Sequence, residues 1–265
     1  NILIIVVDDM GYRDLGVTGH PFIETPSLNA LAKSGAIFDN FYAPASVCSP
    51  SRASMMTGRM NYRLGIYSFI YNGGGYVHLK ESETTFPQLF QKSGYDTALI
   101  GKWHCSHNDV QKKYKLPSMK KYGFNYYFGS DNNTIINNKP KWWRNSIDLG
   151  TQKGLASDVV TKDAINWISN IRNKDKPFLL NVHYYEPHWK IVGPKNLVKK
   201  YGDHYDGDFE KAHYAACLEN LDTNIGHILS SLKKEGVDKN TIVIFTSDNG
   251  PAKYSQKSHS YSRNA

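Results

Sequence analysis

Short apolar runs alternate with helical apolar patterns along most of the chain. The β-branched run over residues 2–7 predicts a strand buried on both faces of a parallel sheet. The other predicted strands cover residues 37–42, 95–100, 177–185 and 241–246, and the predicted helices cover residues 26–34, 50–57, 85–92, 156–171 and 209–232. Because strands and helices alternate, we predict an α/β fold with a mainly parallel central sheet flanked by helices.

Residues 105–154 interrupt this alternation. They are rich in Lys, Asn, Tyr and Trp and have weak periodicity, so we interpret them as an insertion or as long, substrate-facing loops. Within them, Trp142, Trp143 and Arg144 could stack on sugar rings or pack into the core, and both readings stay open. No linker or repeat marks a boundary, so we expect residues 1–265 to form one domain.

The composition excludes several classes of protein. With 40% hydrophobic and 13% aromatic residues the chain is not intrinsically disordered, and 3 Cys are too few for a disulfide framework. Cys105 and Cys217 could pair or stay free. The longest apolar run is far shorter than the about 20 residues of a membrane-spanning helix, so we expect no membrane span. The chain opens without Met, and a removed targeting segment is compatible with that.

The formal net charge of +8 is concentrated in the middle of the chain. Residues 101–200 contain 18 Lys and Arg against 7 Asp and Glu. This excess predicts either an anionic partner or a solvated, lysine-rich surface. We find no nucleic-acid recognition motif and expect no nucleic-acid partner.

Polar side chains follow four of the predicted strands. They are Asp8 and Asp9, Lys102 and His104, His188, and Asp248 and Asn249. Each cluster alone is compatible with an ordinary turn. Because the carboxyl ends of parallel strands meet at one edge of a sheet, where ligands bind, we expect these side chains to converge.

Three carboxylates and one amide in this set offer oxygen ligands. Asp8, Asp9, Asp248 and Asn249 match the preference of hard cations such as Ca²⁺ or Mg²⁺, whereas Zn²⁺ sites usually include His or Cys. Without a cation, the neighbouring carboxylates would repel one another and raise each other's pKa. We therefore predict a divalent-cation site.

The segment from Cys48 to Arg52 carries the sharpest chemical signal. Cys48 is expected at the N-terminus of a helix, where backbone N–H groups and the helix dipole attract anions. Arg52 follows one helical turn later and shares a face with Cys48. The alternative is a structural cysteine in a helix cap.

Five short segments together form a pattern typical of one enzyme family. They are Val7-Asp-Asp-Met-Gly11, Cys48-Ser-Pro-Ser-Arg52 continuing to Thr57-Gly-Arg59, Gly101-Lys-Trp-His104, Glu186-Pro-His188 and Ser247-Asp-Asn-Gly250. In these segments and their order, the chain resembles the N-terminal catalytic part of a formylglycine-dependent sulfatase. These enzymes belong to the alkaline-phosphatase-like superfamily. The smaller C-terminal subdomain of the family is absent from the 265 residues, so we expect a piece of a longer enzyme.

The resemblance implies a modified residue and a bound cation. A formylglycine-generating maturation enzyme would convert Cys48 into Cα-formylglycine, whose hydrated aldehyde is the nucleophile. Asp8, Asp9, Asp248 and Asn249 would hold one divalent cation, typically Ca²⁺, together with an oxygen of the modified Cys48.

The resemblance also implies roles for the other polar residues. Arg52 would stabilise the diol, Lys102 and His188 would bind the sulfate oxygens, and His104 would help the diol to break down. His188 is also suited to protonate the leaving alcohol. For His183 and His107 two readings stay open, contact with the substrate or the pocket mouth and an ordinary structural histidine.

The implied activity is hydrolysis of sulfuric esters. The substrate would be a sulfated carbohydrate or an aryl sulfate, and the enzyme would be secreted, periplasmic or lysosomal. Two alternatives remain. One is a phosphate or phosphonate ester hydrolase of the same superfamily, and the other is a non-catalytic protein that binds sulfated glycans.

Overall fold

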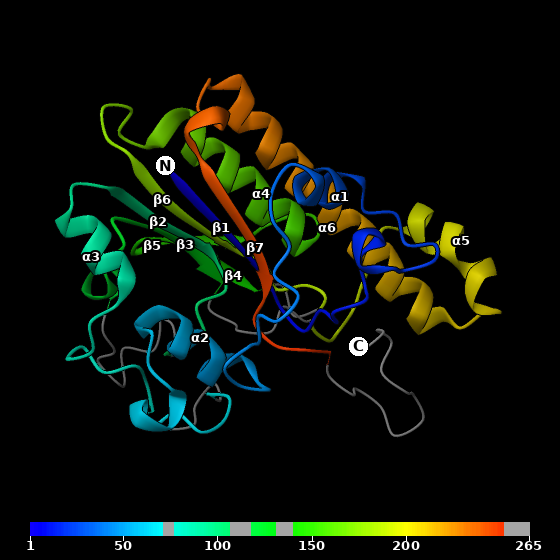
Figure 1. The fold of residues 1–265 in the computed structure, drawn as a ribbon, viewed down its shortest axis with the longest axis horizontal. Helices are drawn as coiled ribbons and strands as arrows, with labels where there is room; N and C mark the ends of the chain where they lie inside the picture. Colours follow the sequence, from blue (N-terminus) through cyan, green and yellow to red (C-terminus); the bar gives the residue numbers. More distant parts are fainter. Residues whose placement is uncertain (71–76, 107–117, 131–139, 252–265) are drawn as a thin grey trace.

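A seven-stranded sheet forms the centre of the molecule (Figure 1). The computed structural model describes residues 1–70, 77–106, 118–130 and 140–251. The strands are β1 (Ile2–Val7), β2 (Asp96–Gly101), β3 (Tyr126–Ser130), β4 (Lys141–Arg144), β5 (Ile147–Thr151), β6 (Phe178–His183) and β7 (Ile242–Ser247). Their order is β5-β4-β3-β2-β6-β1-β7, and β4 alone runs opposite to the other six strands, so the pairs β3–β4 and β4–β5 are antiparallel. The predicted mainly parallel α/β sheet is confirmed.

Helices cover the sheet on two sides. They are α1 (Pro26–Lys33), α2 (Cys48–Thr57), α3 (Phe86–Lys92), α4 (Ala156–Asn166), α5 (Lys195–Gly202) and α6 (Phe209–Lys234). Successive side chains of a strand point to opposite faces, so Ile100 packs with α4 and α6 while Leu99 packs with α2. The larger core lies on the α4 and α6 side, and the predicted helices are present within a few residues. α4 ends at Asn166, and a π-helical turn continues it to Ile171.

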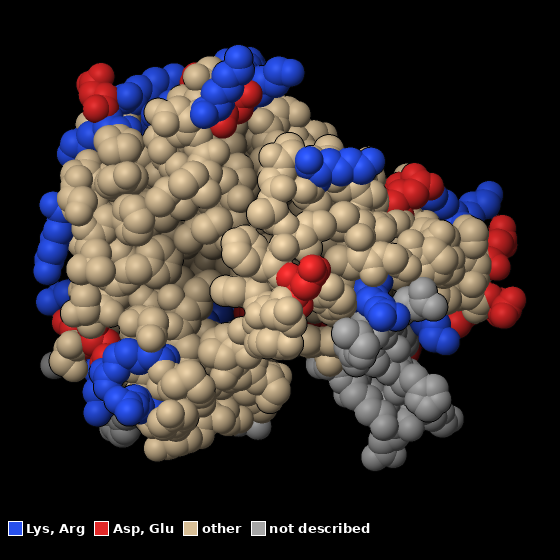
Figure 2. All heavy atoms as spheres, viewed as in Figure 1, with Lys and Arg blue, Asp and Glu red and all other residues tan. Residues whose placement is uncertain are grey.

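The α2 side of the sheet is open at strand β7. Ile242 and Ile244 point to this side and are 64% and 46% exposed. Figure 2 shows that the face turned to the viewer, which carries β7 in Figure 1, has few charged side chains across its centre. Lys and Arg gather mainly at its edges. Among the described residues, no helix is long and apolar enough to cross a membrane.

The strand predicted over residues 37–42 does not form. Asp39 and Asn40 lie in a turn, and the apolar residues on either side are exposed, with Phe38 and Phe41 at 75% and 74%. Asp and Asn favour turns because their side chains bond to nearby backbone groups. These two residues divide the apolar run and prevent it from joining the sheet.

Residues 105–154 are not only an insertion or loops, as the sequence predicted. Three of the seven strands, β3 to β5, lie in this segment, and every residue of β3 is buried. Trp142 is 2% exposed and stacks on Phe128 at a centroid distance of 5.1 Å, so it packs into the core and not on a sugar. The aromatic residues of β3 fit strands well, but the polar residues around them obscured this signal.

Gly101 allows β2 and β6 to approach each other closely at their carboxyl ends. Its φ is 110°, and a Cβ added there would lie 1.8 Å from the carbonyl oxygen of His183. We therefore expect Gly101→Ala to lower the free energy of unfolding of the full-length protein by about 3 kcal/mol or more, measured by denaturant titration.

A second glycine substitution provides the matched control. Gly202 ends α5 with ordinary helical angles, φ −55° and ψ −42°, and a Cβ there would meet no atom within 4 Å. Gly202→Ala should change the stability by about 1 kcal/mol or less, because alanine favours a helix. Equal effects of the two substitutions would contradict the close approach at Gly101.

Candidate active site

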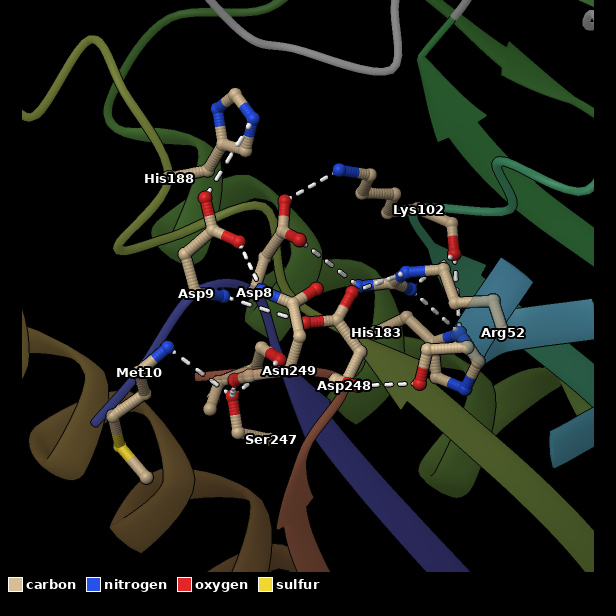
Figure 3. Close-up of polar contacts among 12 residues, drawn as sticks. Asp8, Asp9, Met10, Arg52, Lys102, His183, His188, Ser247, Asp248 and Asn249 are labelled. Atoms are coloured by element: carbon tan, nitrogen blue, oxygen red, sulfur yellow. Dashed lines mark hydrogen bonds and ion pairs between the residues drawn. The ribbon is translucent and has the colours of Figure 1, made fainter. Parts of the chain in front are cut away.

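The polar side chains predicted to converge do lie together at one edge of the sheet (Figure 3). Asp8 and Asp9 follow β1, and Asp248 and Asn249 follow its neighbour β7. Asp8, Asp9 and Asp248 each offer a carboxylate oxygen, and these oxygens lie within 4.8 Å of one another. All three side chains are buried.

Side-chain hydrogen bonds fix the ends of β1 and β7 relative to each other. The N–H of Asp9 donates to Asp248 Oδ1 at 3.3 Å, and Asn249 Nδ2 donates to Asp9 Oδ1 at 2.5 Å. Ser247 Oγ accepts from the N–H of Met10 at 3.1 Å and donates to the carbonyl of Asn249 at 2.7 Å. This role of Ser247 was not predicted from the sequence, although the residue opens the Ser-Asp-Asn-Gly segment.

Asp9 has a backbone conformation that few non-glycine residues adopt. Its φ is 65°, in the left-handed region, as is that of His104 at 54°. Such conformations cost free energy and persist only where the surroundings hold them. Both residues belong to the set predicted from the strand ends, so the unusual backbone coincides with the predicted site.

Helix α2 presents Cys48 at its first turn, as predicted. Cys48 is the first residue of the helix and is 7% exposed. Ser51 Oγ donates to the carbonyl of Asp248, and Ser49 Oγ accepts from the N–H of Ile70 at 3.0 Å, so both serines anchor this end of the helix. Burial raises the pKa of the Cys48 thiol to about 11. At neutral pH the unmodified side chain is therefore a thiol and a weak nucleophile.

Arg52 links α2 to the carboxylates. Its Nε donates to Asp248 Oδ2 at 2.8 Å, and its Nη2 lies 3.7 Å from Asp8 Oδ1. The side chain is fully buried. Removing a guanidinium from water is costly, so these carboxylates are needed to keep the charge in place.

Lys102 supplies a second buried cation. Its Nζ lies 2.5 Å from Asp8 Oδ2, and both side chains are fully buried. Burial is the largest single influence and favours the neutral amine, but the surrounding negative groups, Asp8 foremost, together raise the pKa of Lys102 above its ordinary value. The side chain therefore stays charged.

His104 is buried and neutral. Its Nε2 lies 3.1 Å from the carbonyl oxygen of Ile70 and donates to it, because a carbonyl can only accept. Its Nδ1 is buried and has no hydrogen-bond partner among the described residues. Burial, and then the charge of Lys102, lower the pKa of His104 well below its ordinary value. Nδ1 therefore offers a lone pair that can accept a proton.

His188 lies closer to solvent. Its side chain is 20% exposed, and Nε2 lies 3.8 Å from Asp9 Oδ2. Nδ1 is 2.5 Å from the carbonyl oxygen of Trp189 and donates to it. This histidine therefore lies between the carboxylate cluster and the open side of the site.

His183 is fully buried, and its Nδ1 lies 3.2 Å from Nη1 of Arg52. The reading of His183 as a structural histidine thus fits better than contact with a substrate. Cys105 and Cys217 are free and buried, as is Cys48. His107 lies outside the described residues.

The carboxylate cluster fits a hard cation. Burial, together with the negative charge of Asp8, raises the pKa of Asp248 to about 7, and burial raises that of Asp9. Asp8 Oδ1 and Asn249 Oδ1 are buried and have no hydrogen-bond partner in the described part of the chain. A divalent cation would neutralise the carboxylates and satisfy both oxygens, and oxygen ligands of this kind suit Ca²⁺ or Mg²⁺.

Glu186 is a further buried carboxylate beside the site. Its carbonyl accepts from the N–H of Asp8 at 3.0 Å, and its Oε1 accepts from the N–H of Ser157, in the first turn of α4, at 2.7 Å. Oε2 is buried without a hydrogen-bond partner in the described ranges. Burial raises the pKa of Glu186 from 4.5 to about 7.

This raised pKa predicts how stability depends on pH. Between about pH 4.5 and 7 the folded state keeps the Glu186 proton and the unfolded state releases it, so the stability from this group falls as pH rises. In the wild type, Glu186 should lower the free energy of unfolding by about 3 kcal/mol between pH 5 and pH 7.5. The Glu186→Gln variant should lack this decrease. Denaturant titrations of the full-length proteins at the two pH values measure it. The exposed Glu81→Gln is the control and should follow the wild type. Parallel pH profiles for all three proteins would contradict the prediction.

Comparison with known proteins identifies the family of the chain. Residues 1–265 match the family model described as Sulfatase. N-acetylgalactosamine-6-sulfatase of Rattus norvegicus is 32% identical over 276 residues, covering 95% of this chain and 50% of the rat protein. The Escherichia coli K12 protein called uncharacterized sulfatase YdeN is 31% identical, with 94% of this chain and 52% of that protein covered.

A solved structure confirms the similarity at the level of the fold. The structure of Ps i-CgsB in complex with k-i-k-neocarrahexaose has a TM-score of 0.85 and 25% identity, covering 98% of this chain and 62% of that one. The chain spans about half the length of the curated relatives it matches. Because the family model matches its whole length, the chain belongs to the sulfatase family, within the alkaline-phosphatase-like superfamily.

Proposed function

We propose that this chain provides the active site of a longer protein that hydrolyses sulfate esters of carbohydrates. The observation that carries the proposal is the placement of Cys48 at the start of α2, whose Arg52 is bound to the carboxylate cluster. A helix N-terminus, Arg52 and Lys102 provide positive charge around a buried pocket of acidic residues. A carbohydrate is favoured over an aryl sulfate because the similar Ps i-CgsB was solved with k-i-k-neocarrahexaose.

A modified residue and a metal ion would complete the site. A maturation enzyme would convert Cys48 into formylglycine, and the hydrated aldehyde would supply a nucleophilic hydroxyl. Asp8, Asp9, Asp248 and Asn249 would hold one divalent cation, Ca²⁺ in our proposal, together with an oxygen of the modified Cys48. The cation would supply positive charge for the nucleophile and the sulfate group.

Arg52 and Lys102, the two buried side chains with positive charge beside the carboxylates, stabilise negative charge during the reaction. Cleavage of a sulfate ester builds charge on the transferring group and on the leaving oxygen. In the proposal, Lys102 binds a sulfate oxygen and Arg52 stabilises the modified Cys48. Both are held in place by buried carboxylates before the substrate arrives, so little reorganisation is needed.

Two histidines move protons. His188, the most exposed residue of the set, binds the sulfate and donates a proton from Nε2 to the leaving alcohol. His104 is neutral, and its Nδ1 accepts a proton from the second hydroxyl of the modified Cys48, which allows sulfate to leave. The two rings differ in burial, with His104 at 3% exposure and the His188 side chain at 20%.

Hydrolysis of phosphate or phosphonate esters is the alternative reaction. A doubly charged phosphate monoester usually recruits a second metal ion. Within the described ranges, Asp8, Asp9 and Asp248 are the one group of three or more potential metal ligands that lie close enough together. This favours the sulfate ester. A secreted, periplasmic or lysosomal location stays a prediction.

One experiment separates the possibilities. The full-length protein is produced with a formylglycine-generating enzyme, and mass spectrometry of the Cys48 peptide reports whether the thiol became an aldehyde. Release of sulfate from sulfated oligosaccharides and from an aryl sulfate is compared with hydrolysis of the matched aryl phosphate. Sulfate release that requires the aldehyde supports the proposal. Faster phosphate hydrolysis, binding of sulfated glycans without hydrolysis, or sulfate release by the unmodified thiol would each overturn it.

A further inference from the structure

The buried ring of His183 lies next to the guanidinium of Arg52 (Figure 3). His183 ends β6 and is fully buried, with Nδ1 3.2 Å from Arg52 Nη1 and 3.1 Å from the carbonyl oxygen of Lys102. Its backbone is fixed as well, because its carbonyl accepts from the N–H of Lys102 at 2.8 Å. The neighbouring Gly101 allows this close approach. The strands thus hold the ring at one defined place beside Arg52.

The chemistry of the two side chains determines their hydrogen bond. A guanidinium can only donate, so Nδ1 of His183 accepts from Nη1 only in the tautomer that carries the ring proton on Nε2, and we assign this tautomer. In it, the carbonyl of Lys102 accepts from Nη1 and not from His183. Burial, and then the positive charge of Arg52, lower the pKa of His183 well below its ordinary value. The neutral ring then carries its proton on Nε2. The Nη1 group of Arg52 has two hydrogens and two acceptors, His183 Nδ1 and the carbonyl of Lys102, which lies 3.1 Å away.

These contacts use Nε and Nη1 of the guanidinium but not Nη2. Nε of Arg52 donates to Asp248 and Nη1 has its two acceptors, whereas Nη2 makes no hydrogen bond within the described residues. Nη2 is buried and lies 3.7 Å from Asp8 Oδ1, beside the carboxylates of the proposed cation site. A free, oriented donor at this point can bind an oxygen held near the same carboxylates.

We propose that His183 is a positioning residue for Arg52. By accepting from Nη1, it prevents the guanidinium from turning and keeps Nη2 as the donor that faces the reacting groups. The inference rests on the proposed function, because it assigns Nη2 to the nucleophile made from Cys48. Without His183, Arg52 would keep the hydrogen bonds of Nε to Asp248 and of Nη1 to the carbonyl of Lys102 but lose the third, so the guanidinium could tilt and move Nη2 away from Asp8.

Two substitutions of His183 test this inference. In His183→Asn, the side-chain oxygen can replace Nδ1 as acceptor, whereas His183→Leu fills the space without one. In the full-length, matured protein we expect His183→Leu to lower kcat by about 10- to 100-fold, the effect of losing a hydrogen bond to a charged group. KM should change little, and His183→Asn should retain most of kcat. Crystal structures should show Nη2 beside Asp8 in His183→Asn and displaced in His183→Leu.

His213 provides a matched control. Its Nδ1 accepts from the N–H of Gly193 at 3.0 Å, on α6 and outside the site. His213→Leu therefore removes a similar acceptor and should leave kcat unchanged. If His183→Leu lowers only thermal stability, with kcat per matured molecule and the placement of Arg52 unchanged, the inference is wrong. If the wild type releases no sulfate, the proposed function fails, and the crystal structures still decide whether His183 orients Arg52.

Discussion

The Cys48→Ala variant of the full-length, matured protein should lose sulfate release by on the order of 10⁴-fold or more, the usual scale when a nucleophile is removed. Cys48 is the only residue of the cluster for which we propose covalent chemistry. Its unmodified thiol has its pKa raised to about 11 by burial, so a thiolate is not available at neutral pH. Initial rates of sulfate release from one sulfated oligosaccharide, with kcat and KM separated, measure the effect.

A second buried cysteine, Cys217, shows whether the loss is specific. Cys217 is buried in α6, among the apolar residues of that helix, and has no polar contact with the cluster in the described structure. Cys217→Ala should therefore retain kcat while it loses some stability. Calcium should still raise the Tm of Cys48→Ala, though by less than in the wild type, since four of the five proposed ligand residues remain. An active Cys48→Ala variant would exclude Cys48 as the nucleophile.

The position of the site could be predicted because it depends on the ends of parallel strands. A run such as Ile2 to Val7 has few alternatives to a doubly buried strand, and the polar residues that follow it must lie at the sheet edge. The adjacency of β2, β6, β1 and β7 then brings Lys102, Asp8 and Asp248 together. The helix that carries Cys48 was recognised from Pro50 in its first turn and Gly58 at its end.

The remaining features depend on contacts between distant segments, which local patterns do not contain. β3 was missed because its three aromatic residues lie between polar stretches, and its partners decide that it is a strand. The apolar residues around Asp39 predicted a strand, but no partner strand lies beside them among the described residues. His183 could be classified only once Arg52 and the carbonyl of Lys102 were seen on the same nitrogen.

The charges of the cluster support the cation of the proposed function. Asp8, Asp9 and Asp248 contribute three negative charges, and Arg52 and Lys102 contribute two positive ones, a formal sum of −1 before any ion binds. A sulfate ester is an anion and would be repelled by a negative pocket. One divalent cation changes the formal sum to +1, so the same residues then attract the substrate.

Removing the cation should therefore abolish substrate turnover and lower the thermal stability of the protein. A chelator is expected to lower the Tm of the full-length protein and stop sulfate release, and added Ca²⁺ should restore both. At a concentration 100 times its Kd, Ca²⁺ contributes about 2.7 kcal/mol to stability. Differential scanning calorimetry across a calcium titration measures this contribution.

Among the proposed cation ligands, Asp9 is the one whose replacement gives the most direct test of the cation site. Asp8 and Asp248 pair with Lys102 and Arg52, so changing either would leave a buried cation without its partner. Asp9 makes no ion pair with Lys or Arg in the described structure, and Asn249 and His188 are its side-chain contacts.

Asp9→Asn should fold but lose most of the calcium-dependent rise in Tm. Asp148→Asn, which alters an exposed carboxylate on β5, should keep that rise. If Asp9→Asn and Asp148→Asn respond equally to Ca²⁺, the ion binds elsewhere.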